Sequence, residues 1–240
     1  MNLAIDIGNS SCKAGVYTLN RKEYIIRQDR PDDNLIKDII SRFPVKRAIL
    51  SSVRKSDGPL TDSLENAGIP TLLLSFKTPL PFRLQYESPE TLGADRIAAV
   101  SGAHNLFSSQ NVLIIDAGTA VTYDMLSSAN IYLGGNISPG LAMRFRALNE
   151  FTGNLPLVSR SDSFGNLGVN TTEAIRSGVQ SGLIFEINDY IRTLKNNYHE
   201  LKIIITGGDG EYLSGKVDQD HEFIPDLVVN GLNYILNYNA

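Results

Sequence analysis

Two short segments, each with an aspartate ahead of a glycine, hold most of the residues whose types and spacing could do chemistry. The first runs from Asp6 to Lys13 as Asp-Ile-Gly-Asn-Ser-Ser-Cys-Lys, and the second from Asp116 to Tyr123 as Asp-Ala-Gly-Thr-Ala-Val-Thr-Tyr. Each lies between two apolar runs typical of strands. A glycine-containing hairpin turn lets backbone N–H groups point outward together and tolerates the close approach of an anion. The repeated pattern predicts paired turns that face one nucleotide.

The side chains of these segments suit a phosphate and its counter-ion. Lys13 supplies a compact positive charge for phosphate oxygens. Asp6 would repel a phosphate unless it holds a metal ion or a metal-bound water, and Asp116 can hold an ion in the same way. Further hydrogen-bond donors are Asn9, Ser10, Ser11, Thr119 and Thr122. An Asp-x-Gly hairpin can also occur without any ligand, but its repetition favours a function and suggests a duplicated domain.

Composition excludes several classes of protein. The 240 residues carry a formal net charge of −4, which is unlike the basic footprint of a nucleic-acid binder. Cys12 is the single cysteine, so neither an intrachain disulfide nor a zinc site with several cysteines is expected; a small residue in a tight turn is its simplest interpretation. We find no signal peptide and no apolar run of about 18 residues, so no membrane span is expected and a cytoplasmic location follows.

The first half of the chain predicts an alternating order of elements. Three strands at residues 3–7, 13–19 and 23–27 form a meander, followed by a helix at 35–43, a strand at 47–53, a short helix from residue 58 to about 68 and a strand at 71–74. The order βββαβαβ is the core of the ribonuclease-H-like fold. Residues 78–90 contain three prolines and predict a loop that runs to the active cleft.

The second half nearly repeats this order. The first half ends with a helix at 97–107, which carries Asp95 and Arg96 in its first turn. The second half begins with strands at 112–116, 121–126 and 131–136. Helices at 141–150 and 172–194, a strand at 202–206 and a last helix at 225–238 give βββααβα, with a loop at 153–168. We therefore predict an α/β protein of two ribonuclease-H-like domains, residues 1–108 and 109–240, as in actin-like ATPases and sugar kinases, with a nucleotide cleft between them. Thr206-Gly207-Gly208 would lie on the adenosine side, or would simply cap a helix.

The chain resembles the type III pantothenate kinases over nearly its whole length. The block Gly93-Ala94-Asp95-Arg96 before a helix is its most specific motif. The other matching segments are residues 6–13, 116–120 and 134–140 and Asn170-Thr171 with the helix that follows.

The resemblance implies specific roles. ATP, with Mg²⁺, would be bound by Asp6, Ile7, Gly8, Asn9, Ser10, Ser11, Cys12 and Lys13, and by Thr119. Asp95 would be the general base that takes the proton from the pantothenate hydroxyl. The pantothenate pocket would be formed by Tyr86, Gly93, Ala94, Asp95, Arg96 and Thr171, the last acting across a homodimer interface. Asp116 would coordinate K⁺ or NH₄⁺.

Each of these residues also has a simpler structural interpretation. Asp95 could be an ordinary helix cap beside Arg96, Tyr86 a core aromatic residue, and Thr171 a cap of the long helix. At the level of function, the alternatives are a kinase of another small alcohol and a nucleotide-binding regulator like the accessory transcription factors related to this family, because a fold does not by itself define a function. A base at Asp95 and the lack of a basic helix argue against the regulator.

Overall fold

The computed structural model describes residues 1–9, 11–29, 33–52 and 58–240. The chain forms two compact units. Unit 1 comprises Met1–Ser109, Leu126–Gly134 and Asp226–Ala240, and unit 2 comprises Gln110–Met125 and Gly135–Pro225. The division into domains 1–108 and 109–240 stays a prediction. Among the described residues, no helix combines the length and apolar character needed to cross a membrane.

Unit 1 is built on a five-stranded sheet in the order β3-β2-β1-β4-β5. Its elements are β1 (Asn2–Ile7), β2 (Cys12–Thr18), β3 (Arg21–Gln28), α1 (Asp33–Arg42), β4 (Arg47–Ser52), α2 (Gly58–Asn66) and β5 (Thr71–Leu73). β1 pairs with β2, and β2 with β3, in antiparallel fashion. β4 pairs in parallel with β1 and with β5, and the helices α1 and α2 provide the crossover connections that parallel strands need. The predicted order βββαβαβ is confirmed.

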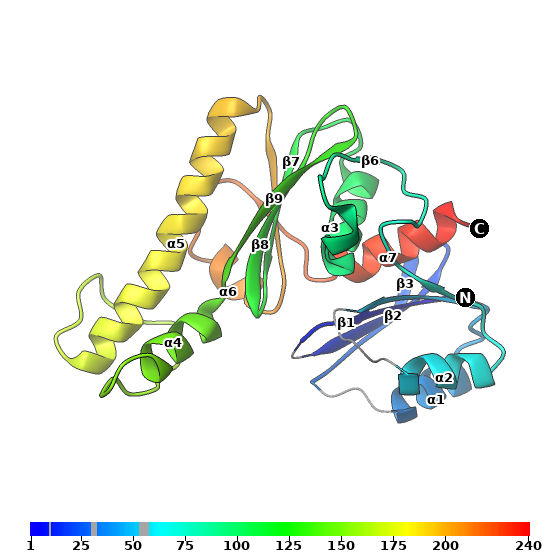
Figure 1. Cartoon of the computed structure of the whole chain (residues 1–240), viewed down its shortest axis with the longest axis horizontal. Coiled ribbons are helices and arrows are strands. Elements are labelled where there is room, and N and C mark those ends of the chain that lie inside the picture. Colours follow the sequence, from blue (N-terminus) through cyan, green and yellow to red (C-terminus); the bar gives the residue numbers. More distant parts are fainter. Residues whose placement is uncertain (10, 30–32, 53–57) are drawn as a thin grey trace. The chain divides into compact units, whose positions relative to one another are not determined.

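The two faces of this sheet have different tasks, because successive side chains of a strand point to opposite faces. Leu3, Ile5 and Ile7 of β1 belong to the hydrophobic core that includes α1 and α2. The alternate residues of β1 face α7 (Leu227–Tyr238), and Asn2 for example donates a hydrogen bond to Asn233 of α7, while α3 (Ala94–Leu106) packs against α7 and β4. Figure 1 shows α1 and α2 on one side of the sheet and α3 and α7 on the other. Asp6 therefore lies on the face that α3 and α7 cover.

Glycines let α3 and α7 approach each other closely. A Cβ atom on Gly231 of α7 would lie 1.9 Å from the carbonyl oxygen of Ala98 in α3, and one on Gly102 would lie 2.5 Å from the carbonyl oxygen of Leu227. Only glycine fits such an approach of two backbones. This contact fixes α3, and with it Asp95, against the last helix of the chain.

Unit 2 contains the second meander and its helices. Its elements are β7 (Val112–Ala117), β8 (Ala120–Leu126), β9 (Ile131–Pro139), α4 (Leu141–Glu150), α5 (Thr171–Asn197), β10 (Lys202–Thr206), α6 (Gly210–Ser214) and β11 (Glu222–Phe223), and its strands follow the order β11-β10-β7-β8-β9. Leu126 of β8 and the start of β9 group with unit 1, where β6 (Arg83–Leu84) pairs in parallel with Ile131 and Tyr132. The long helix α5 packs against the sheet, with Tyr190 stacked on Tyr123 at 4.3 Å between ring centroids.

The predicted order βββααβα of the second half is confirmed apart from α6 and β11, which were missed, as were β6 and the short 3-10 helix η1 (Pro89–Thr91) of the first half. β6, β11 and α6 contain 2, 2 and 5 residues, too few to show a periodic pattern. β6 lies inside the segment predicted to be a loop at 78–90. It forms because Arg83 N–H and Gln85 N–H donate to the carbonyl oxygens of Asn130 and Tyr132.

Candidate active site

The first acidic turn connects the end of β1 to the start of β2, two inner strands of the sheet of unit 1. Gly8 N–H donates to the carbonyl oxygen of Ser11 at 2.9 Å, which closes the turn. Asp6 stands directly opposite Lys13 in the antiparallel register, on the face covered by α3 and α7. Ile7 and Cys12 form the next pair, and both are buried in the core on the other face. Ser10 lies outside the described residues.

Asp6 is half-buried and lies within the influence of a second negative charge, that of Asp95. Its Oδ1 atom is buried and makes no hydrogen bond within the described part of the chain. Burial and the negative charge of Asp95 raise the pKa of Asp6 from 3.8 to about 7, although the hydroxyl of Ser51 and the ammonium of Lys13 lower it in part. A carboxylate with an unsatisfied buried oxygen is costly unless a cation or a donor reaches it. Asp6 is thus suited to bind a cation, or a water bound to one.

Asp95 lies at the start of α3, in the same unit. Its Oδ1 atom accepts a hydrogen bond from the backbone N–H of Arg96 at 2.9 Å. The residue at the N-cap position is Gly93, without a side-chain cap, so the interpretation of Asp95 as the cap residue is wrong. A Cβ atom at position 93 would lie 2.4 Å from Asp95 Oδ1. Glycine in the Gly93–Arg96 block therefore leaves room for the carboxylate of Asp95.

Lys13 has a partner that the sequence did not reveal. Its Nζ atom lies 3.2 Å from Oδ1 of Asp226, which directly precedes α7, and Nζ of Lys22 lies 2.5 Å from the other oxygen of Asp226. These residues are more than 200 positions apart in the chain, and no local motif marks Asp226. The side chain was missed because only the return of α7 to unit 1 brings it to the turn.

Tyr86 lies just after β6, against the start of β9. Its ring centroid is 6.0 Å from that of Tyr132, and a Cβ atom on Gly134 would lie 3.9 Å from its ring. Gly134 has a φ of +109°, which disfavours other residues. Tyr86 is half-buried. Arg96, the other large side chain of the predicted pantothenate pocket, is only 6% exposed.

In unit 2, three glycine-containing segments converge at the second acidic turn. Gly118 N–H donates to Ala120, and Gly140 N–H donates to the carbonyl oxygen of Thr119 at 3.1 Å. A Cβ atom on Gly140 would lie 2.2 Å from the carbonyl oxygen of Gly118, so residues 134–140 can reach this turn only with glycine there. Asp209 N–H donates to the carbonyl oxygen of Ala117 at 2.8 Å, which adds the third segment. Since Thr206 ends a strand, the interpretation of Thr206–Gly208 as a helix C-cap is wrong.

Asp116 is the second-last residue of β7 and lies beside Gly207, and its surroundings fit a hard cation. Gly207 has a φ of +96°, and a Cβ atom there would lie 2.4 Å from Asp116 Oδ1 and 2.3 Å from the carbonyl oxygen of Ala117. Carboxylate and carbonyl oxygens are the ligands that such ions prefer. Across the described residues, no group of three or more His, Cys, Asp or Glu side chains could hold a metal ion. Mg²⁺ in phosphoryl-transfer sites commonly uses one or two carboxylates together with the phosphates of its nucleotide.

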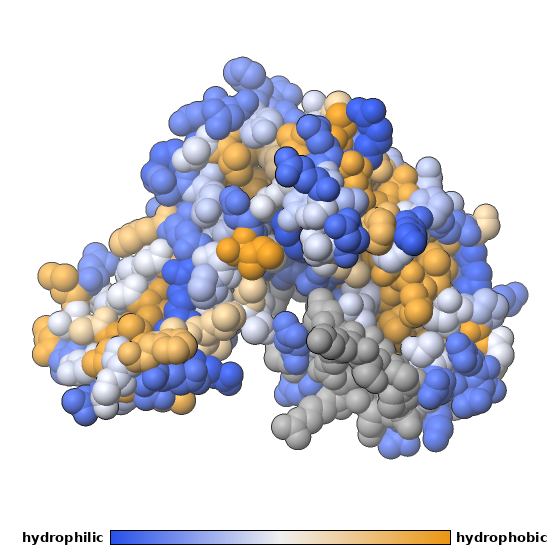
Figure 2. Space-filling model, in the orientation of Figure 1, coloured by the Kyte–Doolittle hydropathy of each residue, from blue (hydrophilic) through white to orange (hydrophobic). Residues whose placement is uncertain are grey.

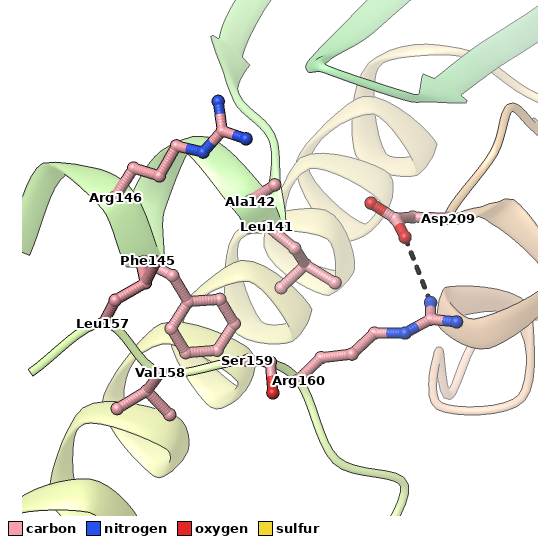
Figure 3. Close-up of a pocket in the computed structure, with 9 residues that line it drawn as sticks. All are labelled: Leu141, Ala142, Phe145, Arg146, Leu157, Val158, Ser159, Arg160 and Asp209. Carbon is pink, nitrogen blue, oxygen red and sulfur yellow. Dashed lines mark hydrogen bonds and ion pairs between the residues drawn. The ribbon is translucent and has the colours of Figure 1, made fainter. Parts of the chain in front are cut away.

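Unit 2 also has a pocket of about 420 Å³ beside the Gly207–Asp209 segment. Figure 3 shows that Leu141 and Phe145 of α4 and Val158 of the following loop form an apolar wall, while Arg160 is paired with Asp209 at 3.0 Å. The guanidinium of Arg160 also lies 4.8 Å from the ring centroid of Tyr212. The remaining lining residues are Ala142, Arg146, Leu157 and Ser159. An apolar wall with a few charged groups suits a flat heterocycle.

Thr171 is the first residue of α5 and is exposed. Asn170 is the N-cap, and its side chain accepts a hydrogen bond from Glu173 N–H at 3.0 Å. The interpretation of Thr171 as the helix cap is therefore wrong, and its hydroxyl is not needed for that purpose.

The chain has clear relatives among known proteins. The model of the family described as type III pantothenate kinase matches residues 2–193. A type III pantothenate kinase from Porphyromonas gingivalis W83 is 42% identical over 242 residues, covering 100% of this chain and 99% of the relative. One from Bacteroides fragilis ATCC 25285 is 40% identical over 239 residues, covering 100% and 98%.

Solved structures show the same fold. A Baf family protein from Campylobacter jejuni, named as a proposed transcriptional activator, superposes with a TM-score of 0.64 at 24% identity and covers 99% of this chain and 98% of its own. A polyphosphate/ATP glucomannokinase from Arthrobacter superposes with a TM-score of 0.52 at 12% identity, covering 99% and 98%. Both likenesses concern the fold alone, and they agree with the predicted α/β fold class.

Proposed function

Because the chain belongs to the type III pantothenate kinase family, we propose that Asp95 is the general base of its reaction and that the first acidic turn binds the phosphates of ATP. The reaction transfers a phosphoryl group from ATP to pantothenate and gives 4'-phosphopantothenate, at the first step of coenzyme A biosynthesis. ATP is used together with a divalent metal ion. The alternative of a nucleotide-binding regulator is not favoured, since the full-length relatives are named as kinases.

One observation supports the base most directly: Asp95 lies close enough to Asp6 for its charge to raise the pKa of Asp6, although 89 positions separate the two residues. Phosphoryl transfer depends mainly on positioning and on neutralising charge. Asp95 accepts the proton of the pantothenate hydroxyl while the hydroxyl oxygen attacks the γ-phosphorus and the bond to ADP breaks. The N–H of Arg96 orients one carboxylate oxygen, so the other can face the alcohol.

The phosphates bind at the turn between β1 and β2. Gly8, which has no Cβ atom, lets an anion approach the turn, Asn9, Ser10 and Ser11 supply donors, and Lys13 supplies the positive charge. Ile7 and Cys12 contribute only main-chain groups, because their side chains belong to the core. Asp6 would hold Mg²⁺ or a water bound to it, and Thr119 donates to ATP from the second turn.

The adenosine end of ATP is proposed to occupy the pocket in Figure 3. Its wall of Leu141, Phe145 and Val158 can pack on a purine, and it includes Asp209, which directly follows the Thr206–Gly208 segment predicted to serve this end of the nucleotide. Asp116, the neighbour of Gly207, holds a monovalent cation, K⁺ or NH₄⁺. Replacing K⁺ by Na⁺ should then raise the ATP KM, and an unchanged KM would contradict the cation site.

Pantothenate is proposed to bind in unit 1 next to Asp95. Arg96 is buried and can pair its planar guanidinium with the substrate carboxylate through two parallel hydrogen bonds. Gly93 and Ala94 line the pocket with backbone atoms, and Tyr86 forms a wall. Thr171 contacts pantothenate from the second chain of a homodimer.

Exposed apolar side chains support the dimer. Phe151 and Leu157, which follow α4 in the chain, are 84% and 63% exposed, and Leu167 and Val169, which precede α5, are 87% and 90% exposed. Figure 2 shows apolar surface at this end of unit 2. Such a patch on a globular protein commonly marks a protein interface. Val169→Glu should give a particle of one 26.3 kDa chain with a higher pantothenate KM; a wild-type protein that is itself a single chain would refute the dimer.

The function is tested by ADP release with ATP, Mg²⁺, K⁺ and pantothenate. Asp95→Asn should lower kcat by a factor of about 100 or more, the usual contribution of a positioned base. Asp62→Asn is the matched control, because Asp62 is an exposed carboxylate on α2. If the Asp95 variant keeps near-normal turnover, the base has been assigned to the wrong residue. The cytoplasmic location stays a proposal.

A further inference from the structure

One partly buried carboxylate, that of Asp226, joins two lysines from neighbouring strands of unit 1. Lys13 of β2 donates to Oδ1 of Asp226 at 3.2 Å, and Lys22 of β3 donates to Oδ2 at 2.5 Å. The side chain of Asp226 is 13% exposed, against 25% for Lys13 and 48% for Lys22. The pair that includes Lys13 is therefore better shielded from solvent than the pair that includes Lys22. Shielding from solvent strengthens a charge-assisted hydrogen bond.

The side chain of Asp226 does not cap α7, the helix that it precedes. It occupies the N-cap position of α7, yet its side chain makes no capping hydrogen bond. Burial by itself would raise the pKa of Asp226, but the hydrogen bonds and charges of Lys22 and Lys13 outweigh burial and lower that pKa. The carboxylate is thus ionised at neutral pH and directed at the lysines.

Lys13 stands at the end of the phosphate-binding turn, opposite Asp6. A lysine side chain has four rotatable bonds, and an ammonium group that must find a phosphate loses much of that freedom on binding. A partner that already holds the ammonium in place reduces this loss. Since an ammonium has three N–H donors, one hydrogen bond to Asp226 does not use up its capacity to bind a phosphate.

We propose that Asp226 is a positioning residue that holds the Lys13 ammonium at the phosphate-binding turn, with Lys22 balancing the carboxylate's charge. The inference rests on the proposed phosphate role of Lys13. It assigns to the last helix of the chain a part in binding ATP, through a side chain that contacts no substrate.

The sign of the effect separates positioning from simple electrostatics. Removing a negative charge near the phosphates would by itself lower the ATP KM, because it makes the surroundings more positive. If Asp226 positions Lys13, Asp226→Asn should instead raise the ATP KM by about fivefold, the usual weight of a partly buried ion pair. The kcat and the pantothenate KM should stay within about twofold of wild type, and Asp226→Glu should restore most of the ATP KM.

A double-mutant cycle with Lys13→Met completes the test. In the Lys13→Met background, Asp226→Asn should have no further effect on the ATP KM, and melting temperatures should show that each variant is folded. An ATP KM that Asp226→Asn leaves unchanged or lowers, or raises equally in both backgrounds, overturns the positioning role. If Lys13→Met itself leaves the ATP KM unchanged, the phosphate role of Lys13 falls, and the inference with it.

Discussion

Replacing Asp6 by asparagine should stabilise the ligand-free protein at neutral and alkaline pH although it removes kinase activity. Burial and the charge of Asp95 raise the pKa of Asp6 from 3.8 to about 7. The folded protein therefore binds a proton at Asp6 more tightly than the unfolded chain does. For such a group the free energy of unfolding is highest below the unfolded pKa and falls as pH rises towards the folded pKa. The ionised carboxylate of Asp6 therefore destabilises the folded protein, and we expect the function of the site to require it.

The size of this strain follows from the pKa shift. Each pKa unit corresponds to about 1.4 kcal/mol, so the ionised form of Asp6 costs about 4 kcal/mol of stability above the folded pKa. Part of that cost is already present in mildly acidic solution. Between about pH 5 and about pH 8, the free energy of unfolding of the wild type should fall by about 2.5 kcal/mol relative to that of Asp6→Asn. The variant has no titrating group at position 6.

Urea unfolding followed by circular dichroism, with EDTA present, measures this difference. The comparison uses the pH dependence and not the absolute stability, because an amide can form hydrogen bonds that a carboxylate cannot. Asp62→Asn removes an exposed carboxylate and should keep the wild-type pH dependence. Parallel curves for the wild type and Asp6→Asn between these two pH values would refute the argument that Asp6 is strained.

Three other variants test separate parts of the structure. Asp95→Asn removes the like charge beside Asp6, so the acidic limb of kcat/KM for ATP should shift to lower pH in the residual activity of the variant; an unshifted limb would disprove the coupling. Gly93→Ala places a methyl group 2.4 Å from Asp95 Oδ1 and should displace the carboxylate. The kcat should fall about tenfold while the melting temperature changes little. An unchanged kcat would show that the carboxylate can move without loss of activity. Gly231→Ala brings a methyl group against the backbone of α3 and should lower the free energy of unfolding by about 3 kcal/mol. Gly182→Ala in α5 meets nothing within 4 Å and should not destabilise the protein, so equal losses in these two variants would contradict the close packing.

Much of the fold followed from local patterns. The apolar runs of β1, β2 and β4 and the helical period of α1 were sufficient to predict the order βββαβαβ of the first seven elements. The short strands β6 and β11 were missed because two residues carry no period, and they exist only through hydrogen bonds to strands formed elsewhere in the chain. Asn170, and not Thr171, caps α5, a choice between neighbouring residues that residue type alone could not make.

The candidate site shows the same division between local and distant information. Both acidic turns were visible in the sequence, because the glycine and the donors for a phosphate and the carboxylate for its cation stand within a few positions, and the Gly93–Arg96 block was visible through the resemblance to the family. Asp226 was not visible, because its role comes from a lysine more than 200 positions away.

The amino-acid sequence by itself determined which side chains could take part in chemistry and which strands and helices would carry them. The tertiary structure alone decided that Asp95 lies beside Asp6, that Gly207 lies against Asp116 and that Asp226 holds Lys13. The physical reason is that these contacts depend on which face of a sheet a distant helix or turn covers. Such packing is set by the buried surface of a whole unit, and a single carboxylate or glycine contributes too little to leave a local pattern.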